Sequence, residues 1–413
     1  MNKEKRRVPK LRFPGFTEDW EQCKLNEFLS VSDLKNTEDK YNKKDVLSVS
    51  GDYGIVNQIE FQGRSFAGVS VSNYGVVETG DIVYTKSPLK LNPYGIIKTN
   101  RINNGIVSTL YAIYKTKENC DSKFIEHYFN LDSRLNKYLK PLVNKGAKND
   151  MKVSSENALI GEVCFPHITE QKLIADFLDW LDVYITLHQR KLEHLNLKKK
   201  ALLQKLFPKD GERYPELRFP GFTDAWEQCK LDDIAKIKTG GGTPKTAKPE
   251  YWSGNIPWIQ SSDLVEGDIT HVNINKFINN NALKNSAAKL ISRDSIALVT
   301  RVGVGKVAVI NQDFTTSQDF LSLSDFDGSD IKFLAYQLYR LMQENAKVLQ
   351  GTSIKGITKT ELIEQSISIP KSDQEQNLIS NVLSKIDSII TLHQRKLERL
   401  QEVKKGLLQK MFV

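Results

Sequence analysis

The sequence predicts a mixed α+β protein in which two related domains are separated by an antiparallel two-helix coiled coil. A duplicated opening supports this prediction, since PKLRFPGFTEDWEQCKL at residues 9–25 returns as PELRFPGFTDAWEQCKL at residues 215–231. A duplicated ending also supports it, because ITLHQRKLE at residues 185–193 returns unchanged at residues 390–398. Both repeats have an offset of about 205 residues, so a unit of half the chain occurs twice.

Length and composition agree with a multidomain globular protein. The chain has 413 residues, of which 39% are hydrophobic and 26% are charged, and about 150 residues per domain is the usual prior. It has no apolar run of about 18 residues, the minimum for a membrane span, and we expect no membrane association. Its four cysteines are widely spaced and predict neither a disulfide framework nor a zinc site. The composition therefore predicts a cytoplasmic protein.

A variable region follows the duplicated opening of each half, since residues 30–120 and 236–325 share no convincing run. A helix-like segment follows at residues 121–143 and again at residues 328–351, with apolar residues three and four apart. We then expect a turn at Gly146 or Gly351 and a short strand that ends before Pro166 or Pro370, because proline removes a ladder donor.

A long helix closes each half, and its apolar residues alternate at spacings of four and three. This mean period of about 3.5 is typical of coiled coils, so the two helices are expected to pack together. Antiparallel pairing relates the halves by a pseudo-two-fold axis, and helices of about 33 residues would span roughly 50 Å. The seam residues that we assign are Leu181, Ile185, His188, Leu192 and Leu195 in the first helix and Ile386, Ile390, His393, Leu397 and Leu400 in the second.

Polar residues interrupt this seam. His188 and His393 are predicted to fix the register of the helices, and a metal-binding pair is the less favoured alternative. The lysines near the helix ends, Lys198–Lys200, Lys404 and Lys405, fit a solvated face or a docking surface. We assign an N-terminal variable domain, a central spacer helix, a C-terminal variable domain and a C-terminal spacer helix to residues 1–165, 166–212, 213–369 and 370–413.

Several resemblances to catalytic motifs fail on inspection. Gly303-x-Gly305-x-x-Ala308 has dinucleotide-fingerprint spacing, but a strand-like run follows where a helix is required, so a β-hairpin is predicted. GGGTPKT at residues 240–246 lacks the spacing of a phosphate-binding loop. Asn92-Pro93-Tyr94 is similar to the loop that holds a flipped adenine in amino-methyltransferases but lacks its second proline. We therefore predict no catalytic residue and no metal site.

The variable regions carry the candidate DNA-binding residues. The net charge of +9 suits a polyanion. Lysine, serine, threonine and backbone amides mostly contact phosphate, whereas arginine, asparagine and glutamine read base edges. We interpret Trp252 and Trp258 as core aromatics rather than base-stacking residues. The candidates are Lys86, Ser87, Lys90, Asn92, Tyr94, Arg101 and Asn103 in the first region and Lys238, Thr239, Gly241, Gly242, Thr243, Lys245, Gln260, Ser261, Arg301 and Lys306 in the second.

The two-copy layout resembles the specificity subunit of type I restriction-modification enzymes. The motifs that carry the resemblance are L-R-F-P-G-F-x-x-x-W in each half, G-G-T-P…Y-W…I-P-W-I…D at residues 241–263, and a proline and Glu-Gln pair before each long helix. The resemblance implies two target recognition domains, each of which reads one half of a split double-stranded DNA site. It implies two methyltransferase subunits docked on the helices, and restriction subunits in the full complex.

The resemblance also implies that this chain binds no cofactor itself. S-adenosylmethionine would belong to the methyltransferase partner, and ATP and Mg²⁺ to the restriction partner. The first variable region lacks the G-G-T-P pattern of the second. Two alternatives remain open: a stand-alone DNA-binding protein without a methyltransferase partner, and an enzyme that binds a nucleotide at the Gly303 loop.

Overall fold

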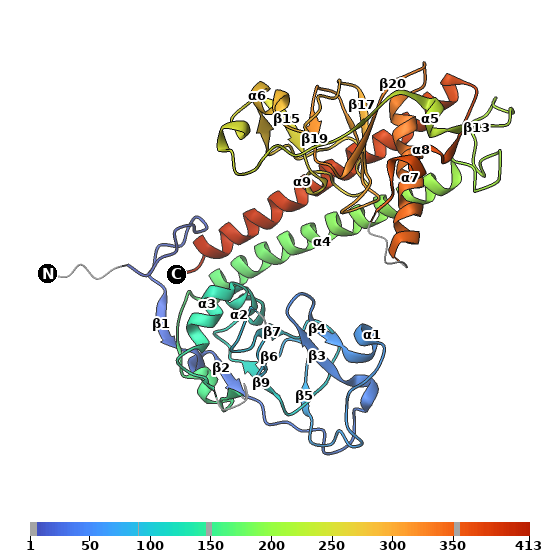
Figure 1. The fold of residues 1–413 in the computed structure, drawn as a ribbon. Helices are drawn as coiled ribbons and strands as arrows, with labels where there is room; N and C mark the ends of the chain where they lie inside the picture. The colour runs from blue at the N-terminus through green and yellow to red at the C-terminus, as the bar shows by residue number, and fades with distance from the viewer. Residues whose placement is uncertain (1–5, 90, 146–150, 351–355) are drawn as a thin grey trace. The chain divides into compact units, whose positions relative to one another are not determined.

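The fold is that of a computed structural model that describes residues 6–89, 91–145, 151–350 and 356–413. Its described residues form two compact units, Met1–Gln189 with Arg395–Val413 and Arg190–Gln394. The two longest helices, α4 (Ile168–Lys205) and α9 (Asp373–Lys410), each begin in one unit and end in the other (Figure 1). Each unit therefore contains the start of one long helix and the end of the other.

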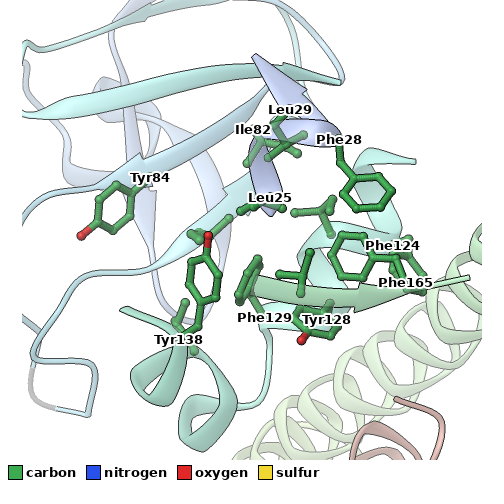
Figure 2. Close-up of a cluster of buried hydrophobic side chains, with 14 of the residues drawn as sticks. Leu25, Phe28, Leu29, Ile82, Tyr84, Phe124, Tyr128, Phe129, Tyr138 and Phe165 are labelled. Atoms are coloured by element: carbon green, nitrogen blue, oxygen red, sulfur yellow. The ribbon is translucent and has the colours of Figure 1, made fainter. Parts of the chain in front are cut away.

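The first unit is organised around a four-stranded antiparallel sheet in the order β2-β9-β6-β7. Strand β6 is buried along its whole length because apolar clusters cover both of its faces. Ile82 and Tyr84 enter the aromatic core in Figure 2, whereas Val83 packs in a second cluster with Val77 and Ile113. The strands are β2 (Leu29–Val31), β6 (Ile82–Thr85), β7 (Ile97–Thr99) and β9 (Tyr111–Thr116).

Short ladders and helices complete this unit. Antiparallel pairs join β1 (Glu21–Lys24) to β12 (Glu162–Phe165), β3 (Leu47–Ser50) to β4 (Gly54–Asn57), β5 (Gly75–Val77) to β8 (Gly105–Val107), and β10 (Asn144–Lys145) to β11 (Met151–Lys152). The helices are α1 (Gln58–Gln62), α2 (Ser122–Phe129) and α3 (Asp132–Leu139). The sheet, strand β12 and helix α2 meet in the core of Figure 2.

The second unit has a four-stranded antiparallel sheet of the same connectivity, in the order β14-β20-β17-β18. Its strands are β14 (Ala235–Gly240), β17 (Ser295–Val299), β18 (Val307–Ile310) and β20 (Phe320–Phe326). The other strands are β13 (Glu227–Lys230), β15 (Ile256–Ile259), β16 (Phe277–Ile278), β19 (Thr315–Thr316) and β21 (Ser366–Ile369). The helices are α5 (Leu231–Ile234), α6 (Asn280–Lys284), α7 (Ile331–Gln350) and α8 (Lys359–Ile363).

The two variable regions therefore share one sheet despite their unrelated sequences. In each, the first strand pairs with the last, and the last pairs with the second, which pairs with the third. The regions differ in what joins the strands: the first has β3, β4 and α1, and the second has β15, β16 and α6. A common scaffold thus presents different connecting segments, which is the usual way in which one fold supports different binding specificities.

The helix predicted over residues 121–143 is broken in two. Leu131 is extended, with φ −89° and ψ 108°, between α2 and α3. Asn130, Asp132 and Ser133 surround this break, and such side chains compete with the helical backbone for hydrogen bonds. The corresponding α7 is continuous. The predicted strands end as expected, with β12 before Pro166 and β21 before Pro370, whereas Gly146 and Gly351 lie outside the described residues.

The duplicated motifs form the same joint in each unit. Arg12 Nε and Nη2 bind the two carboxylate oxygens of Glu170 at 2.7 and 2.8 Å, and Arg218 binds Glu375 at the same two distances. Both glutamates are buried in the first turn of α4 or α9. Negative charge is favourable at a helix N-terminus. The arginine of L-R-F-P-G-F therefore ties the start of each half to the long helix that ends it.

Each unit takes an aromatic anchor from the end of a long helix. Phe412, after α9, packs with Trp20, Phe124 and Tyr128 in the first unit, and the guanidinium of Arg134 lies over its ring. The second unit repeats this arrangement, with Phe207, after α4, against Trp226 and Phe333 and beneath Arg340. The core of each unit is therefore completed by the helix that starts in the other unit.

The antiparallel pairing of the long helices is confirmed by reciprocal ion pairs. In the first unit, Asp182 Oδ1 lies 2.5 Å from Lys404 Nζ. In the second unit, Asp387 Oδ1 lies 2.5 Å from Lys199 Nζ. The duplication relates Asp182 to Asp387 and Lys199 to Lys404, so one ion pair occurs twice with the helices exchanged. Each helix has 38 residues, slightly more than predicted.

The assigned seam residues lie on the inner side of the helices. Leu181, Ile185, Leu195, Ile386 and Leu397 are buried. The others are half-buried: His188, Leu192, Ile390, His393 and Leu400. His188 packs edge-on against Tyr184 with ring centroids 4.7 Å apart. The lysines differ, because Lys198, Lys200 and Lys405 are exposed, whereas Lys199 is only 5% exposed.

We predict that Phe412→Ala destabilises the first unit selectively. The substitution removes a buried ring from an aromatic core, and such changes cost about 3–5 kcal/mol. Hydrogen exchange should become faster in α2 while α7 keeps its protection. Val413→Ala, at an exposed neighbour, is the control. Equal loss of protection in α2 and α7 would contradict the assignment of Phe412 to the first core.

The two ion pairs predict unequal effects of their lysines. Lys199 and Asp387 have side chains 7% and 4% exposed, compared with 21% and 38% for Lys404 and Asp182. Removal of one partner from a buried pair leaves an uncompensated charge. Lys199→Met should therefore lower the melting temperature of its unit by several degrees more than Lys404→Met lowers that of the other. Calorimetry tests this prediction, and equal shifts would refute it.

Candidate nucleic-acid interface

The predicted DNA-binding residues of the first unit lie around the ends of β6 and β7. Lys86 and Ser87 directly follow β6 and are half-buried. Lys86 Nζ hydrogen-bonds Ser155 Oγ at 3.3 Å, and burial lowers the pKa of this amine. Tyr94 is half-buried against the aromatic core. Lys90 lies outside the described residues. Because Lys86 and Tyr94 are half-buried, both side chains lie against the protein rather than fully in solvent.

Asn92 is buried in the segment that is similar to an adenine-binding loop. Its Nδ2 donates to Asp132 Oδ1 at 2.8 Å. Its Oδ1 is buried and has no hydrogen-bond partner among the described residues. The amide therefore anchors the segment to α3 and is only 8% exposed.

Arg101 forms one ion pair with α2 and one with α4. Its Nε lies 2.7 Å from Glu126 Oε2, and its Nη1 lies 2.6 Å from Asp179 Oδ1. Burial opposes the charge of Arg101, but these carboxylates raise the pKa of its guanidinium. His127 Nε2 also lies 2.8 Å from Asp179 Oδ1. Arg101 thus holds the first sheet region against the long helix, whereas Asn103 is exposed.

Two lysines of the second unit bind protein oxygens. Lys238 Nζ lies 2.8 Å from Asp232 Oδ1. Lys306 Nζ donates to the carbonyl oxygens of Ser261 at 3.0 Å and Leu264 at 2.9 Å. Both lysines are half-buried. Lys238 therefore ties β14 to α5, and Lys306 ties the Gly303 loop to residues 261–264.

Lys245 and Arg301 are the exposed basic candidates of the second unit. Neither forms an ion pair with another described residue. Ser261 lies beside the loop that carries Arg301, because a Cβ added to Gly303 would lie 3.8 Å from Ser261 Cβ. Gln260 is half-buried and accepts a hydrogen bond from Lys276 Nζ at 3.2 Å. The structure thus brings Gln260, Ser261 and the Arg301 loop together.

The glycine-rich segment is packed against its own unit. A Cβ on Gly241 would lie 2.0 Å from Ser317 O, and one on Gly242 would lie 2.0 Å from Ala287 O. Thr239 is half-buried at the end of β14, and Thr243 Oγ1 donates to Gln318 Oε1. Close approach of backbone to backbone therefore accounts for both glycines.

The predicted β-hairpin at Gly303 is confirmed. Strands β17 and β18 pair directly across it, with Leu298 opposite Val307. Gly303 and Gly305 have φ values of 89° and 112°, in the region that favours glycine. The loop leads into a strand, so it offers no helix N-terminus to a pyrophosphate. The nucleotide-binding alternative loses its structural basis at this loop.

The core role of the tryptophans is confirmed. Trp258 is 4% exposed, and its Nε1 donates to Gly242 O at 3.1 Å. Trp252 packs edge-on against it with ring centroids 5.0 Å apart. The pair lies in a cluster with Tyr251 and Ile278, and so supports the G-G-T-P segment from within.

One exposed aromatic group was missed from the sequence. Tyr53, in the β3–β4 turn, and Phe61, in α1, are 70% and 46% exposed, with ring centroids 5.2 Å apart. The guanidinium of Arg64 lies 4.6 Å from the ring centroid of Phe66, which is 58% exposed. Aromatic residues in the turn-rich segment 51–66 were the available signal. Exposed aromatics beside arginine are typical of surfaces that stack the bases of single-stranded nucleic acid.

The described residues contain no group of three or more His, Cys, Asp or Glu side chains that could hold a metal ion. The four cysteines are free thiols. Within the described ranges, no helix has the length and apolar character needed to cross a bilayer.

Known proteins share sequence and architecture with this chain. Residues 223–402 match the family model described as the type I restriction modification DNA specificity domain. The chain is 31% identical over 194 residues to the type I restriction enzyme MjaIX specificity subunit of Methanocaldococcus jannaschii, which covers 46% of this chain and 44% of that protein. Over these segments the chain is similar to type I specificity subunits. The resemblance seen in the sequence is thus confirmed.

Further matches support this specificity-subunit relationship. The chain is 28% identical to the EcoR124I/EcoR124II specificity subunit of Escherichia coli, over 36% of this chain and 38% of that one. Matched segments span 38% to 62% of the curated relatives' own lengths. The fold is similar to that of the type I system S subunit from M. genitalium, with a TM-score of 0.63, 13% identity and coverage of 98% and 99%.

A second solved chain agrees in fold. This solved chain belongs to a study of complex assembly and conformational transition in the type I R-M system. Its TM-score is 0.54 and its identity is 16%, over 98% of this chain and 99% of that one. The specificity-subunit fold, with two mixed α+β domains and a pair of long helices, therefore extends over nearly the whole chain.

The contacts of Asp179 with Arg101 and His127 predict that the stability of the first unit depends on pH in the acid range. Burial opposes the charge of Asp179, but hydrogen bonds from His127 and Arg101 hold its pKa well below the usual value of 3.8. A lowered folded-state pKa stabilises the unit above the unfolded value and loses that contribution as pH falls below it. Asp179→Asn should therefore destabilise the first unit at pH 7, and the difference from wild type should shrink below about pH 4.

Thermal melting across pH tests this effect. Asp176→Asn is the control, because Asp176 is 70% exposed and lies 3.5 Å from Lys123. A constant difference between Asp179→Asn and wild type from pH 7 to pH 3 would contradict the role of the Asp179 charge.

Proposed function

We propose that this chain is the sequence-specific DNA-recognition subunit of a type I restriction-modification complex in the cytoplasm. Each unit reads one half of a bipartite, asymmetric site in double-stranded DNA. The observation that carries the proposal is the repeated sheet with unlike connecting segments, because equal scaffolds with different loops suit two different half-sequences. The specificity domain matched over residues 223–402 supports it.

The connecting segments supply the proposed DNA contacts. Lys245 and Arg301 are exposed in the second unit, and the loop that carries Arg301 lies beside Ser261. In the first unit, Asn103, Tyr53 and Arg64 are likewise exposed and are the proposed DNA contacts. Lysine contacts to phosphate provide affinity, and arginine, asparagine and glutamine provide sequence readout.

The chain acts without catalysis of its own in this proposal. Methylation belongs to two methyltransferase subunits that bind S-adenosylmethionine, and cleavage belongs to restriction subunits that use ATP and Mg²⁺. The exposed apolar residues of α4, which include Trp180 at 60% and Leu187 at 55%, favour a chain with protein partners over the stand-alone DNA-binding alternative.

Exchange of one variable domain tests this function. Residues 236–369 are replaced by the corresponding residues of a homologue with a different site, and the modified bases are mapped by single-molecule sequencing in a host with the partner methyltransferase. One half-site should change and the other should persist. A change in both half-sites, or in neither, would overturn the proposed division of labour.

Point substitutions in the second unit separate affinity from readout. Lys245→Ala should weaken binding to all DNA sequences and reduce the salt dependence of binding by about one phosphate contact. Arg301→Ala should relax base preference in one half-site, at a cost of about 1–3 kcal/mol. Lys371→Ala, at an exposed lysine paired with Glu227, is the control. Fluorescence anisotropy at several salt concentrations measures these effects, and wild-type binding by both loop variants would exclude these contacts.

A further inference from the structure

Helix α4 carries an exposed apolar stripe next to its buried seam. The stripe residues follow spacings of four and three, as the seam does. Leu173, Trp180 and Leu187 are 41%, 60% and 55% exposed. The α4 stripe comprises Leu173, Phe177, Trp180, Tyr184 and Leu187, all in the first unit.

The aromatic residues of the α4 stripe are held in one arrangement. The rings of Trp180 and Tyr184 stack with centroids 5.6 Å apart and an angle of 6°. The ring of Phe177 stacks on that of Trp180 with centroids 6.3 Å apart. Phe13 of the L-R-F-P-G-F motif packs edge-on against Phe177, with centroids 5.6 Å apart. Lys396 Nζ donates to Tyr184 OH at 2.7 Å. A rigid aromatic surface loses little conformational entropy when a partner binds it.

Helix α9 carries the duplicated stripe with different chemistry. The α9 stripe comprises Leu378, Val382, Lys385, Ile389 and Leu392, all in the second unit. Its terminal leucines correspond to those of α4, and Leu378 and Leu392 are 41% and 66% exposed. The centre differs, because Lys385 replaces Trp180 and Ile389 replaces Tyr184.

The position of the stripes indicates what covers them. Each stripe continues the heptad spacing of the established seam on an adjacent face of the same helix. Helices with two adjacent apolar stripes fit bundles of more than two helices, in which a partner contributes an amphipathic helix. Because the duplication repeats the stripe, one kind of partner protein can bind twice.

Under the proposed function, two copies of one partner protein dock on the long helices, and we propose that the copy at the α4 stripe binds first and more tightly than the copy at the α9 stripe. This inference rests on the proposed function, in which that partner is the methyltransferase subunit. Trp and Tyr dominate the energetics of interfaces, whereas Lys is depleted from interface cores. The affinity of the α4 stripe for the partner is therefore at least about tenfold higher than that of the α9 stripe.

Titration of the full chain with the partner methyltransferase tests the order of binding. Native mass spectrometry should show a one-to-one complex that accumulates before the two-to-one complex. Hydrogen exchange in the one-to-one complex should slow in the α4 stripe, and the α9 stripe should become protected only in the two-to-one complex. Equal filling of both sites, or first protection of α9, would overturn the proposal.

Reciprocal substitutions locate the cause of the difference. Lys385→Trp should strengthen the second binding step, so that little one-to-one complex accumulates. Trp180→Lys should weaken the first step by about tenfold or more. Both residues are exposed, so the melting temperature should hold in each variant. Leu197→Lys, at an exposed leucine outside both stripes, is the control and should bind as wild type does.

Two other outcomes have defined meanings. If the chain binds DNA but no methyltransferase, the partner assigned under the proposed function is wrong, and this inference falls with it. If methyltransferase binds in two equal steps that Trp180→Lys leaves unchanged, the proposed function stands and only the ordered assembly is overturned. Self-association of the chain that Trp180→Lys abolishes would assign the stripe to a second copy instead and would also overturn the proposal.

Discussion

The bidentate ion pair between an arginine of the repeated opening motif and a glutamate of the long helix holds each half of this protein together. Glu170 and Glu375 are each 1% exposed, and Arg12 and Arg218 satisfy both of their carboxylate oxygens. A buried carboxylate without its partner would be strongly destabilising. The next residue extends the joint, because Gln171 Oε1 accepts a hydrogen bond from the amide of Asp121, which caps α2. The start of the long helix, the opening motif and α2 are thereby tied together.

The far end of each long helix imposes a second constraint. The first core depends on Phe412, which is far from Trp20 in the sequence, and the second depends on Phe207, which is near Trp226. These are contacts of very different sequence separation, and distant contacts delay folding because a long loop must close first. The reciprocal ion pairs at Asp182 and Asp387 then fix how the helices align within each unit. These contacts fix the long helices and the core within each unit. They do not involve the connecting segments of the variable regions, whose sequences can therefore differ.

The duplicated frame could be predicted from the sequence because its residues must fit one another closely. Leu181 and Ile386 repeat in one heptad phase, and that periodicity identifies both the helices and their pairing. The shared sheet could not be predicted, since buried strands such as β6 and β17 need only apolar residues of suitable volume, and many sequences satisfy that need. The break at Leu131 was also missed, because local competition for hydrogen bonds leaves the apolar spacing unchanged.

The candidate site shows a similar division. Arginine and lysine were recognised as possible DNA contacts, but their partners are distant in sequence. Asp179 follows Arg101 by 78 residues, and Ser261 precedes Lys306 by 45 residues. Composition therefore overstates the free positive charge of the loops, and Lys245 and Arg301 are the exposed cations among the second-unit candidates. The net charge of +9 is divided between internal ion pairs and the proposed DNA-facing segments.

Hydroxyl-radical footprinting of the proposed complex with a methyltransferase, on the DNA site that this complex modifies, tests the central claim most directly. Two protected patches separated by a less protected interval are predicted, and an exchange of the second variable domain should move only one patch to a new sequence. A single continuous patch, or two patches that both depend on the second domain, would contradict a subunit that reads each half-site with a separate domain.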